Sequence, residues 1–217
     1  MKVAIWWVKR DFRLNDNAAL FNALESNGIV IPMYLFEPLL MNGPDWGSFH
    51  AEAISGGAMS LSKNLTHFNS KLLTFGSSPI DAVEQIRQRV NLSGFEVKEV
   101  FSHEETALTH TYERDNEFKN WCQNNSIQWH EFTNNGVIRG PIDRNHWEKR
   151  FVKYMMQERP KFHKDKLSAS FPEKLKNIFQ DKFYDNSETH RPSISASEYM
   201  NVSERSGNLI LKDFLNN

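Results

Sequence analysis

The sequence predicts an α/β fold with a five-stranded parallel sheet, doubly wound by helices, and then a mostly irregular linker with short helices. From residue 2 to about 132, short apolar runs typical of buried strands alternate with segments whose apolar residues recur every three or four positions. This alternation predicts parallel strands joined by right-handed crossovers. Beyond residue 135 the alternation ends, and prolines interrupt a polar sequence.

The first half of the sheet is expected from two apolar runs and two helical stripes. Residues 3–8 form an uninterrupted apolar run, and residues 18–24 follow it with helical spacing. Residues 29–36 form a second apolar run that ends at Glu37-Pro38. A helix over 51–68 is indicated by one apolar stripe, which comprises Ala51, Ile54, Ala58, Leu61, Leu65 and Phe68.

The second half repeats the pattern. A short strand over 71–75 stops at a Gly-Ser-Ser-Pro turn, and the proline suits the first turn of a helix over 79–90. A glycine introduces a strand over 95–101. A long helix over 108–122 and a strand over 127–132 complete the sheet.

The remaining sequence divides into a linker and a terminal piece. We expect the α/β domain at 1–135, a helix and interdomain linker at 136–200, and the start of a further domain at 201–217. Asn145 is expected to cap a helix over 146–157. Amphipathic pieces at 175–183 and 209–215 each need a surface to cover them, and the second predicts a downstream domain.

Composition restricts the possible functions. The 217 residues carry 26 Lys and Arg against 27 Asp and Glu, so no overall positive field attracts nucleic acid. The single cysteine excludes an internal disulfide and is typical of a reducing compartment. No stretch approaches the roughly 20 apolar residues of a membrane span. A cytoplasmic protein without a membrane contact is expected.

Five charged residues follow the first strand: Lys9, Arg10, Asp11, Arg13 and Asp16. Ligands of open α/β sheets bind at the carboxyl ends of the strands. A guanidinium group can donate two hydrogen bonds at once to a carboxylate or a phosphate. The cluster therefore indicates an anion or chromophore site. The alternative is a salt-bridged turn in which Asn15 or Asp16 caps the next helix.

Two further motifs have a functional and a structural interpretation. Ser55-Gly56-Gly57 is like the start of a pyrophosphate loop, but within a helical stripe it more simply weakens or breaks the helix. After the fourth strand, Glu104 or Glu105 could accept hydrogen bonds from a heterocycle, or merely favour the following helix N-terminus. The histidine and cysteine spacings indicate no metal site, and no nucleophile motif is present.

In order along the chain, these motifs resemble the photolyase/cryptochrome family of blue-light flavoproteins. Residues 7–17, WVKRDFRLNDN, are similar to that family's opening W-F-R-x-D-L-R-L-x-D-N. Further similar segments cover the chain to about residue 158: Phe36-Glu37-Pro38, Ser60-Leu61, His103-Glu104-Glu105, Tyr112-Glu113-Arg114-Asp115, Asn135-Gly136-Val137-Ile138-Arg139 and Trp147. Residues 203–215 resemble the opening of the family's helical domain.

The resemblance implies the N-terminal α/β antenna-binding domain of a light-driven DNA-repair flavoprotein. The full-length protein would be a deoxyribodipyrimidine photo-lyase that splits pyrimidine dimers in DNA by electron transfer from FAD. FAD would bind in the C-terminal helical domain, so this chain by itself is expected to hold no catalytic residue and to be inactive.

The family's antenna pigment, which is a folate, a deazaflavin or a flavin, would bind in the α/β domain. By the resemblance, its pocket would be lined by Lys9, Arg10, Asp11, Phe12, Arg13, Glu37, Glu104 and Glu105. Two alternatives remain open. One is a cryptochrome-like photoreceptor, and the other is a free-standing nucleotide-binding module of the universal-stress or electron-transfer-flavoprotein type.

Overall fold

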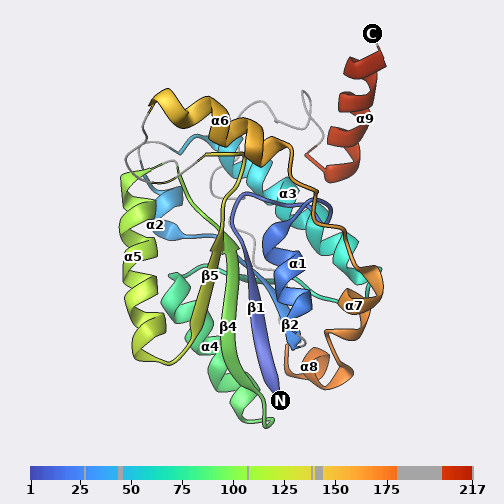
Figure 1. The fold of residues 1–217 in the computed structure, drawn as a ribbon. Coiled ribbons are helices and arrows are strands. Elements are labelled where there is room, and N and C mark those ends of the chain that lie inside the picture. Colours follow the sequence, from blue (N-terminus) through green and yellow to red (C-terminus); the bar gives the residue numbers. More distant parts are fainter. Residues whose placement is uncertain are drawn as a thin grey trace.

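The sheet has five parallel strands in the order β3-β2-β1-β4-β5, as predicted (Figure 1). The computed structural model describes residues 1–26, 28–43, 46–106, 108–137, 139, 144–179 and 202–216. The strands are β1 (Lys2–Val8), β2 (Ile29–Leu35), β3 (Leu73–Phe75), β4 (Glu96–His103) and β5 (Gln128–Phe132). Each overlaps a strand expected from the sequence.

Nine helices are found in the described part of the chain. They are α1 (Ala18–Glu25), α2 (Pro38–Met41), α3 (Ser48–Thr66), α4 (Pro79–Asn91), α5 (Thr109–Asn124), α6 (Arg144–Met155), α7 (Lys164–Ala169), α8 (Glu173–Ile178) and α9 (Glu204–Asn216). The one-turn α2 and the short α7 were not predicted. Because α6 begins at Arg144, Asn145 lies inside the helix, and its prediction as the cap is wrong.

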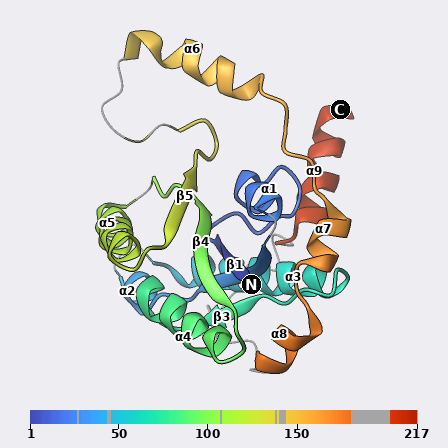
Figure 2. The same ribbon diagram turned by 60° about the horizontal axis from the view of Figure 1, so that its bottom comes forward.

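Alternate residues of β1 enter two separate cores, one on each face of the sheet. Val3, Ile5 and Trp7 belong to the core that also contains buried residues of α4, α5 and α8. The residues between them, such as Trp6, join the core formed with α1 and α3. Figure 2 shows α4 and α5 on one side of the sheet and α1 and α3 on the other. The sheet is therefore doubly wound, as predicted.

Residues 164–179 wrap around the end of the sheet at which the strands begin. Leu167 of α7 is buried in the core under α1 and α3, whereas Phe171 and Leu175 are buried in the opposite core. The Val30 amide near the start of β2 donates to the Ser170 carbonyl over 3.1 Å. This segment falls within the range expected for the linker, and it contributes side chains to both cores.

Helix α3 runs unbroken through Gly56 and Gly57. The predicted break at this glycine pair is therefore wrong, and the predicted weakening of the helix stays a prediction. A Cβ on Gly57 would lie 2.7 Å from Cδ2 of Phe12, closer than side chains pack. Phe12 also meets Tyr34 edge-on, with 5.0 Å between the ring centroids. The absence of a side chain at Gly57 therefore allows the ring of Phe12, in the turn after β1, to pack directly against α3.

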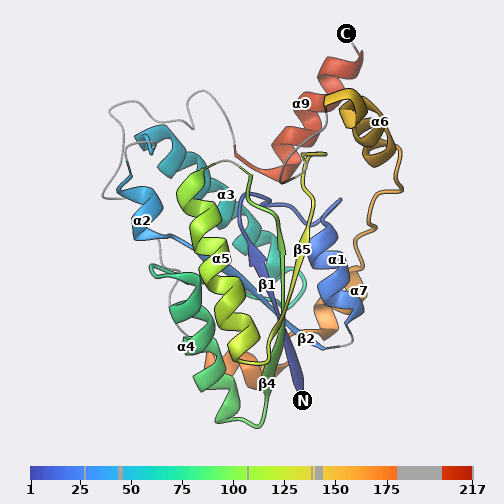
Figure 3. The same cartoon turned by 60° about the vertical axis from the view of Figure 1, so that its left-hand side comes forward.

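Helices α6 and α9 lie at the end of the molecule toward which the strands point (Figures 1 and 3). Glu204, the first residue of α9, accepts from the Leu14 amide (3.0 Å), the Asn15 amide (3.1 Å) and the Asn15 side chain (2.8 Å). Leu209, Ile210, Leu211, Phe214 and Leu215 of this helix are exposed. Among the described helices, none is both long and apolar enough to cross a membrane.

Candidate functional site at the carboxyl ends of the strands

The chain leaves the two central strands toward opposite faces of the sheet. After β1 it enters α1 on one face, and after β4 it enters α5 on the other. The two loops therefore diverge and leave a crevice between the ends of β1 and β4, which is where open α/β sheets bind their ligands. The eight residues predicted for the site lie in or near this region.

Asp11 organises the turn that follows β1. Its buried carboxylate accepts from the Lys9 amide (3.1 Å) and from the Asn17 side chain (2.8 Å), and it lies 2.9 Å from Nδ1 of His103. Asn17 in turn accepts from the Leu20 amide over 2.9 Å, so Asn17 caps α1. The prediction of Asn15 or Asp16 as the cap is wrong, because Asn17 is the residue immediately before the helix.

Lys9 is buried against a carboxylate that the site prediction left out. Its Nζ lies 3.0 Å from Oδ2 and 3.2 Å from Oδ1 of Asp115, in α5. The ammonium also stands over the rings of Trp7 and Trp129, 4.5 Å and 5.2 Å from their centroids. Such contacts stabilise a desolvated cation.

Asp115 is shared by two further cations. Arg114 Nη2 donates to it over 2.7 Å, and Arg139 Nη2 donates over 2.5 Å. Arg114 continues to Glu37 (Nη1 to Oε1, 2.5 Å), and Arg139 continues to Glu131 (3.0 Å). We call these six residues the Asp115 network: Lys9, Glu37, Arg114, Asp115, Glu131 and Arg139. Three cations and three carboxylates balance within it.

Burial and pairing shift the pKa values of these groups in different directions. Burial lowers the pKa of Lys9 and outweighs the opposing effect of Asp115. Burial would raise the pKa of Asp115, but the charges of Lys9 and Arg114 lower it. For Glu37 burial prevails and raises the pKa despite Arg114. For Asp11, burial is outweighed by the hydrogen bond and the charge of His103, which lower the pKa.

The predicted Arg10 and Glu105 form an ion pair at the outer end of the crevice. Arg10 Nε lies 3.2 Å from Oε2 of Glu105, and 49% of the Arg10 side chain is exposed against 8% of the Glu105 side chain. The space behind them, lined by Tyr34, Trp46 and Lys9, has a cavity volume of about 30 Å³. That is about the volume of one water molecule.

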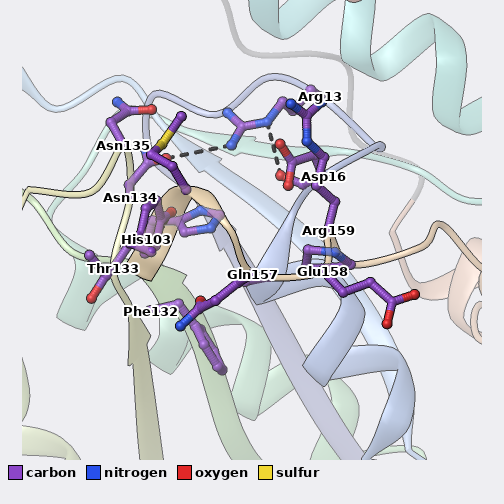
Figure 4. Close-up of a pocket in the computed structure, with 14 residues that line it drawn as sticks. Arg13, Asp16, His103, Phe132, Thr133, Asn134, Asn135, Gln157, Glu158 and Arg159 are labelled. Atoms are coloured by element: carbon purple, nitrogen blue, oxygen red, sulfur yellow. Dashed lines mark hydrogen bonds between the residues drawn. The ribbon is translucent and has the colours of Figure 1, made fainter. Parts of the chain in front are cut away.

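A larger cavity opens on the other side of the β4 end. We call it the polar cavity; it has a volume of about 430 Å³ and lies between the first turn, the end of β5 and residues 154–160 (Figure 4). Among the predicted residues, Arg13 lines it, donating to the Asp16 carbonyl (3.1 Å) and, at 3.5 Å, to Asn134. The Glu104 amide donates to the Phe132 carbonyl and extends the pairing of β4 with β5.

The structure therefore distributes the eight predicted residues over five places. Lys9 and Glu37 belong to the Asp115 network, and Arg10 and Glu105 form the outer pair. Asp11 and Phe12 hold the turn, Arg13 faces the polar cavity, and Glu104 lies where β4 ends. The residues missed are Arg114, Asp115, Glu131, Arg139 and His103. The described residues contain no group of three or more side chains suited to a metal ion.

Comparisons with known proteins agree on one family. The model of the family described as DNA photolyase matches residues 4–153. The chain is 28% identical over 110 residues to a chloroplastic/mitochondrial cryptochrome DASH of Arabidopsis thaliana, and 29% identical over 111 residues to that of Oryza sativa subsp. japonica. These alignments cover 48% of this chain and 18% of each relative.

Two solved structures share the fold. One is an archaeal photolyase from Sulfolobus tokodaii with two FAD molecules, with a TM-score of 0.56 and 20% identity, covering 72% of this chain and 35% of that one. The other is a Synechocystis sp. PCC6803 cryptochrome, with a TM-score of 0.60 and 17% identity, covering 76% and 36%. The chain thus spans about a third of the length of these structures.

Proposed function

Because this chain belongs to the DNA photolyase family, we propose that its α/β domain holds a light-absorbing antenna pigment for a light-driven flavoprotein. The whole protein would bind FAD in a C-terminal helical domain and repair pyrimidine dimers in DNA. The chain by itself would be inactive. The domain limits at 1–135, 136–200 and 201–217 belong to the same proposal.

The observation that carries the pigment proposal is the Arg10–Glu105 pair at the topological switch point. Glu105 is a buried carboxylate with one oxygen bound to Arg10 (3.2 Å) and the other accepting from the Thr106 amide (3.2 Å). Arg10 is half exposed and can turn toward a ligand. A carboxylate that accepts ring N–H groups and a guanidinium that donates to ring carbonyls suit the edge of a folate or flavin ring.

Pigment binding requires the crevice to open. A space of about 30 Å³ cannot hold a fused heterocycle, because ligand pockets of that class measure hundreds of Å³. The Asp115 network is internally balanced, and four of its six residues, Lys9 and Glu37 among them, are buried. Lys9 and Glu37 would therefore serve as the fixed floor. The side chains at the rim that would move are Arg10 and Trp46.

Pigment uptake tests the proposal directly. The 217-residue chain is mixed in the dark with flavin mononucleotide or a reduced folate, and quenching of pigment fluorescence is recorded. We expect saturable binding that weakens roughly tenfold in Glu105→Gln, the loss of about one charge-assisted contact. The matched control Glu84→Gln, in α4, should bind as the parent does. Failure to take up either pigment would overturn the antenna role.

The second candidate is a photoreceptor, because the curated relatives above and one of the two solved structures are cryptochromes. Full-length protein on dimer-containing DNA under blue light distinguishes the two. Loss of dimers only in the light supports repair, and unchanged dimers support the receptor. The nucleotide-binding module of another class is disfavoured by the family match over residues 4–153.

A further inference from the structure

The polar cavity has no role in the pigment proposal. Its walls come from three separate parts of the chain: the turn after β1, the ends of β4 and β5, and residues 154–160. The Tyr154 hydroxyl donates to the Thr133 carbonyl over 3.2 Å and holds the third part against the second. At about 430 Å³, the cavity is within the range of small-molecule sites.

A buried histidine faces this cavity. His103 is 3% exposed, and its Nδ1 is engaged by the Asp11 carboxylate at 2.9 Å. Because Nδ1 is directed at Asp11 and His103 lines the cavity, Nε2 is the ring nitrogen left for a ligand. In Figure 4 the imidazole lies between Asn134 and Asn135 on one side and Arg13, Asp16 and Arg159 on the other.

The balance of charges in the wall favours an anion. Arg13 and Arg159 line the cavity together with the imidazole. Of the two carboxylates in the wall, Glu158 has 82% of its side chain exposed, so solvent screens its charge. Asp16 is the other carboxylate in the wall. Ala18, the first residue of α1, also lies on the wall, where the helix dipole contributes positive potential.

We propose that the polar cavity binds a small organic phosphate of up to mononucleotide size, held by Arg13, Arg159 and Nε2 of His103. A guanidinium group can donate two parallel hydrogen bonds to two oxygens of one phosphate. The side-chain amides of Asn134 and Asn135, after β5, provide further donors. This site is separate from the Arg10–Glu105 pair, which lies across the end of β4. The proposal therefore does not depend on the pigment proposal.

The test uses adenosine monophosphate as the probe and the 217-residue chain as the protein. Thermal unfolding is followed as the probe is added, because a ligand that binds the native state raises Tm in a saturable manner. We expect a saturable rise, and we expect inorganic phosphate to compete. Calorimetric titration then gives the Kd.

Variants separate this site from its neighbours. Arg13→Gln should weaken binding roughly tenfold or more, whereas Arg87→Gln, in α4, should leave the Kd unchanged. His103→Asn keeps a donor for Asp11 and removes Nε2, so it should also weaken binding. If His103→Asn does not fold, Arg13→Gln alone decides. The proposal is overturned if no saturable binding occurs, or if Arg13→Gln binds as tightly as the parent.

Discussion

The adjacent glycines of α3 should respond in opposite ways to the same substitution. In a helix interior, Gly→Ala gains about 1 kcal/mol from backbone propensity alone. At Gly56 the added Cβ would meet Val202 Cβ at 3.6 Å, an ordinary contact. We therefore expect Gly56→Ala to raise the free energy of unfolding by about 0.5–1 kcal/mol.

At Gly57 the same methyl group would lie 2.7 Å from Cδ2 and 3.1 Å from Cγ of Phe12. These ring atoms are close to the Phe12 backbone, so a change of rotamer at the far end of the side chain cannot relieve the clash. Overpacking of this kind costs about 1–3 kcal/mol, which exceeds or cancels the helical gain. We expect Gly57→Ala to be about 2 kcal/mol less stable than Gly56→Ala.

Urea unfolding followed by circular dichroism measures both variants, with a common m value as the check that the unfolded states are comparable. Phe12→Ala provides the decisive background: without the ring, Gly57→Ala should become stabilising. A Gly57→Ala variant at least as stable as the parent would contradict the clash with Phe12. So would a loss of stability that is unchanged in the Phe12→Ala background.

Two further predictions concern buried carboxylates. Asp115→Ala leaves three cations without their shared partner and should lower the free energy of unfolding, measured in urea, by about 3–5 kcal/mol. The control Glu173→Ala, at an exposed position, should lower it by less than about 1 kcal/mol. A loss of less than about 1 kcal/mol in Asp115→Ala would contradict the role of Asp115 in the network. The folded pKa of Asp11 is lowered, so its stabilising contribution is complete above the unfolded value of about 3.9 and declines as pH falls below it. Asp11→Asn should therefore be less stable than the parent at pH 7. Unfolding measured from pH 7 to pH 3 should show the difference in free energy of unfolding between the two proteins narrowing below about pH 4. A difference that does not change with pH would refute this role of Asp11.

The strands and most helices could be predicted because their signals are local. An apolar run or an apolar stripe of period 3.6 identifies a strand or a helix from about ten consecutive residues. The one-turn α2 and the short α7 have too few residues to show a period. The contact made by Gly57 could not be predicted for a different reason: it depends on Phe12, which is 45 positions away in the sequence. Helix propensity alone therefore indicated a possible break that the structure does not have.

The site was predicted only in part, since pairing between distant charges cannot be seen in the sequence. Lys9 and Glu37 were expected to face a ligand, but each is neutralised by a residue of α5. One signal was present: Asp115 falls on the inner side of the predicted helix, beside Phe118 and Cys122. A carboxylate in an apolar stripe requires a buried partner, and Lys9, immediately after the central strand β1, was one candidate by topology.

The hydrogen bonds to Glu204 couple part of the turn after β1 to α9, the last described helix. The amides of Leu14 and Asn15 are covered by a carboxylate that follows them by 190 and 189 positions. Neighbouring amides of β1 are instead protected by the central sheet. In hydrogen exchange, Leu14 and Asn15 should therefore open with α9 as one cooperative unit, at a lower free energy than β1. Two amides at the start of the chain would thus measure how firmly its last described helix is docked.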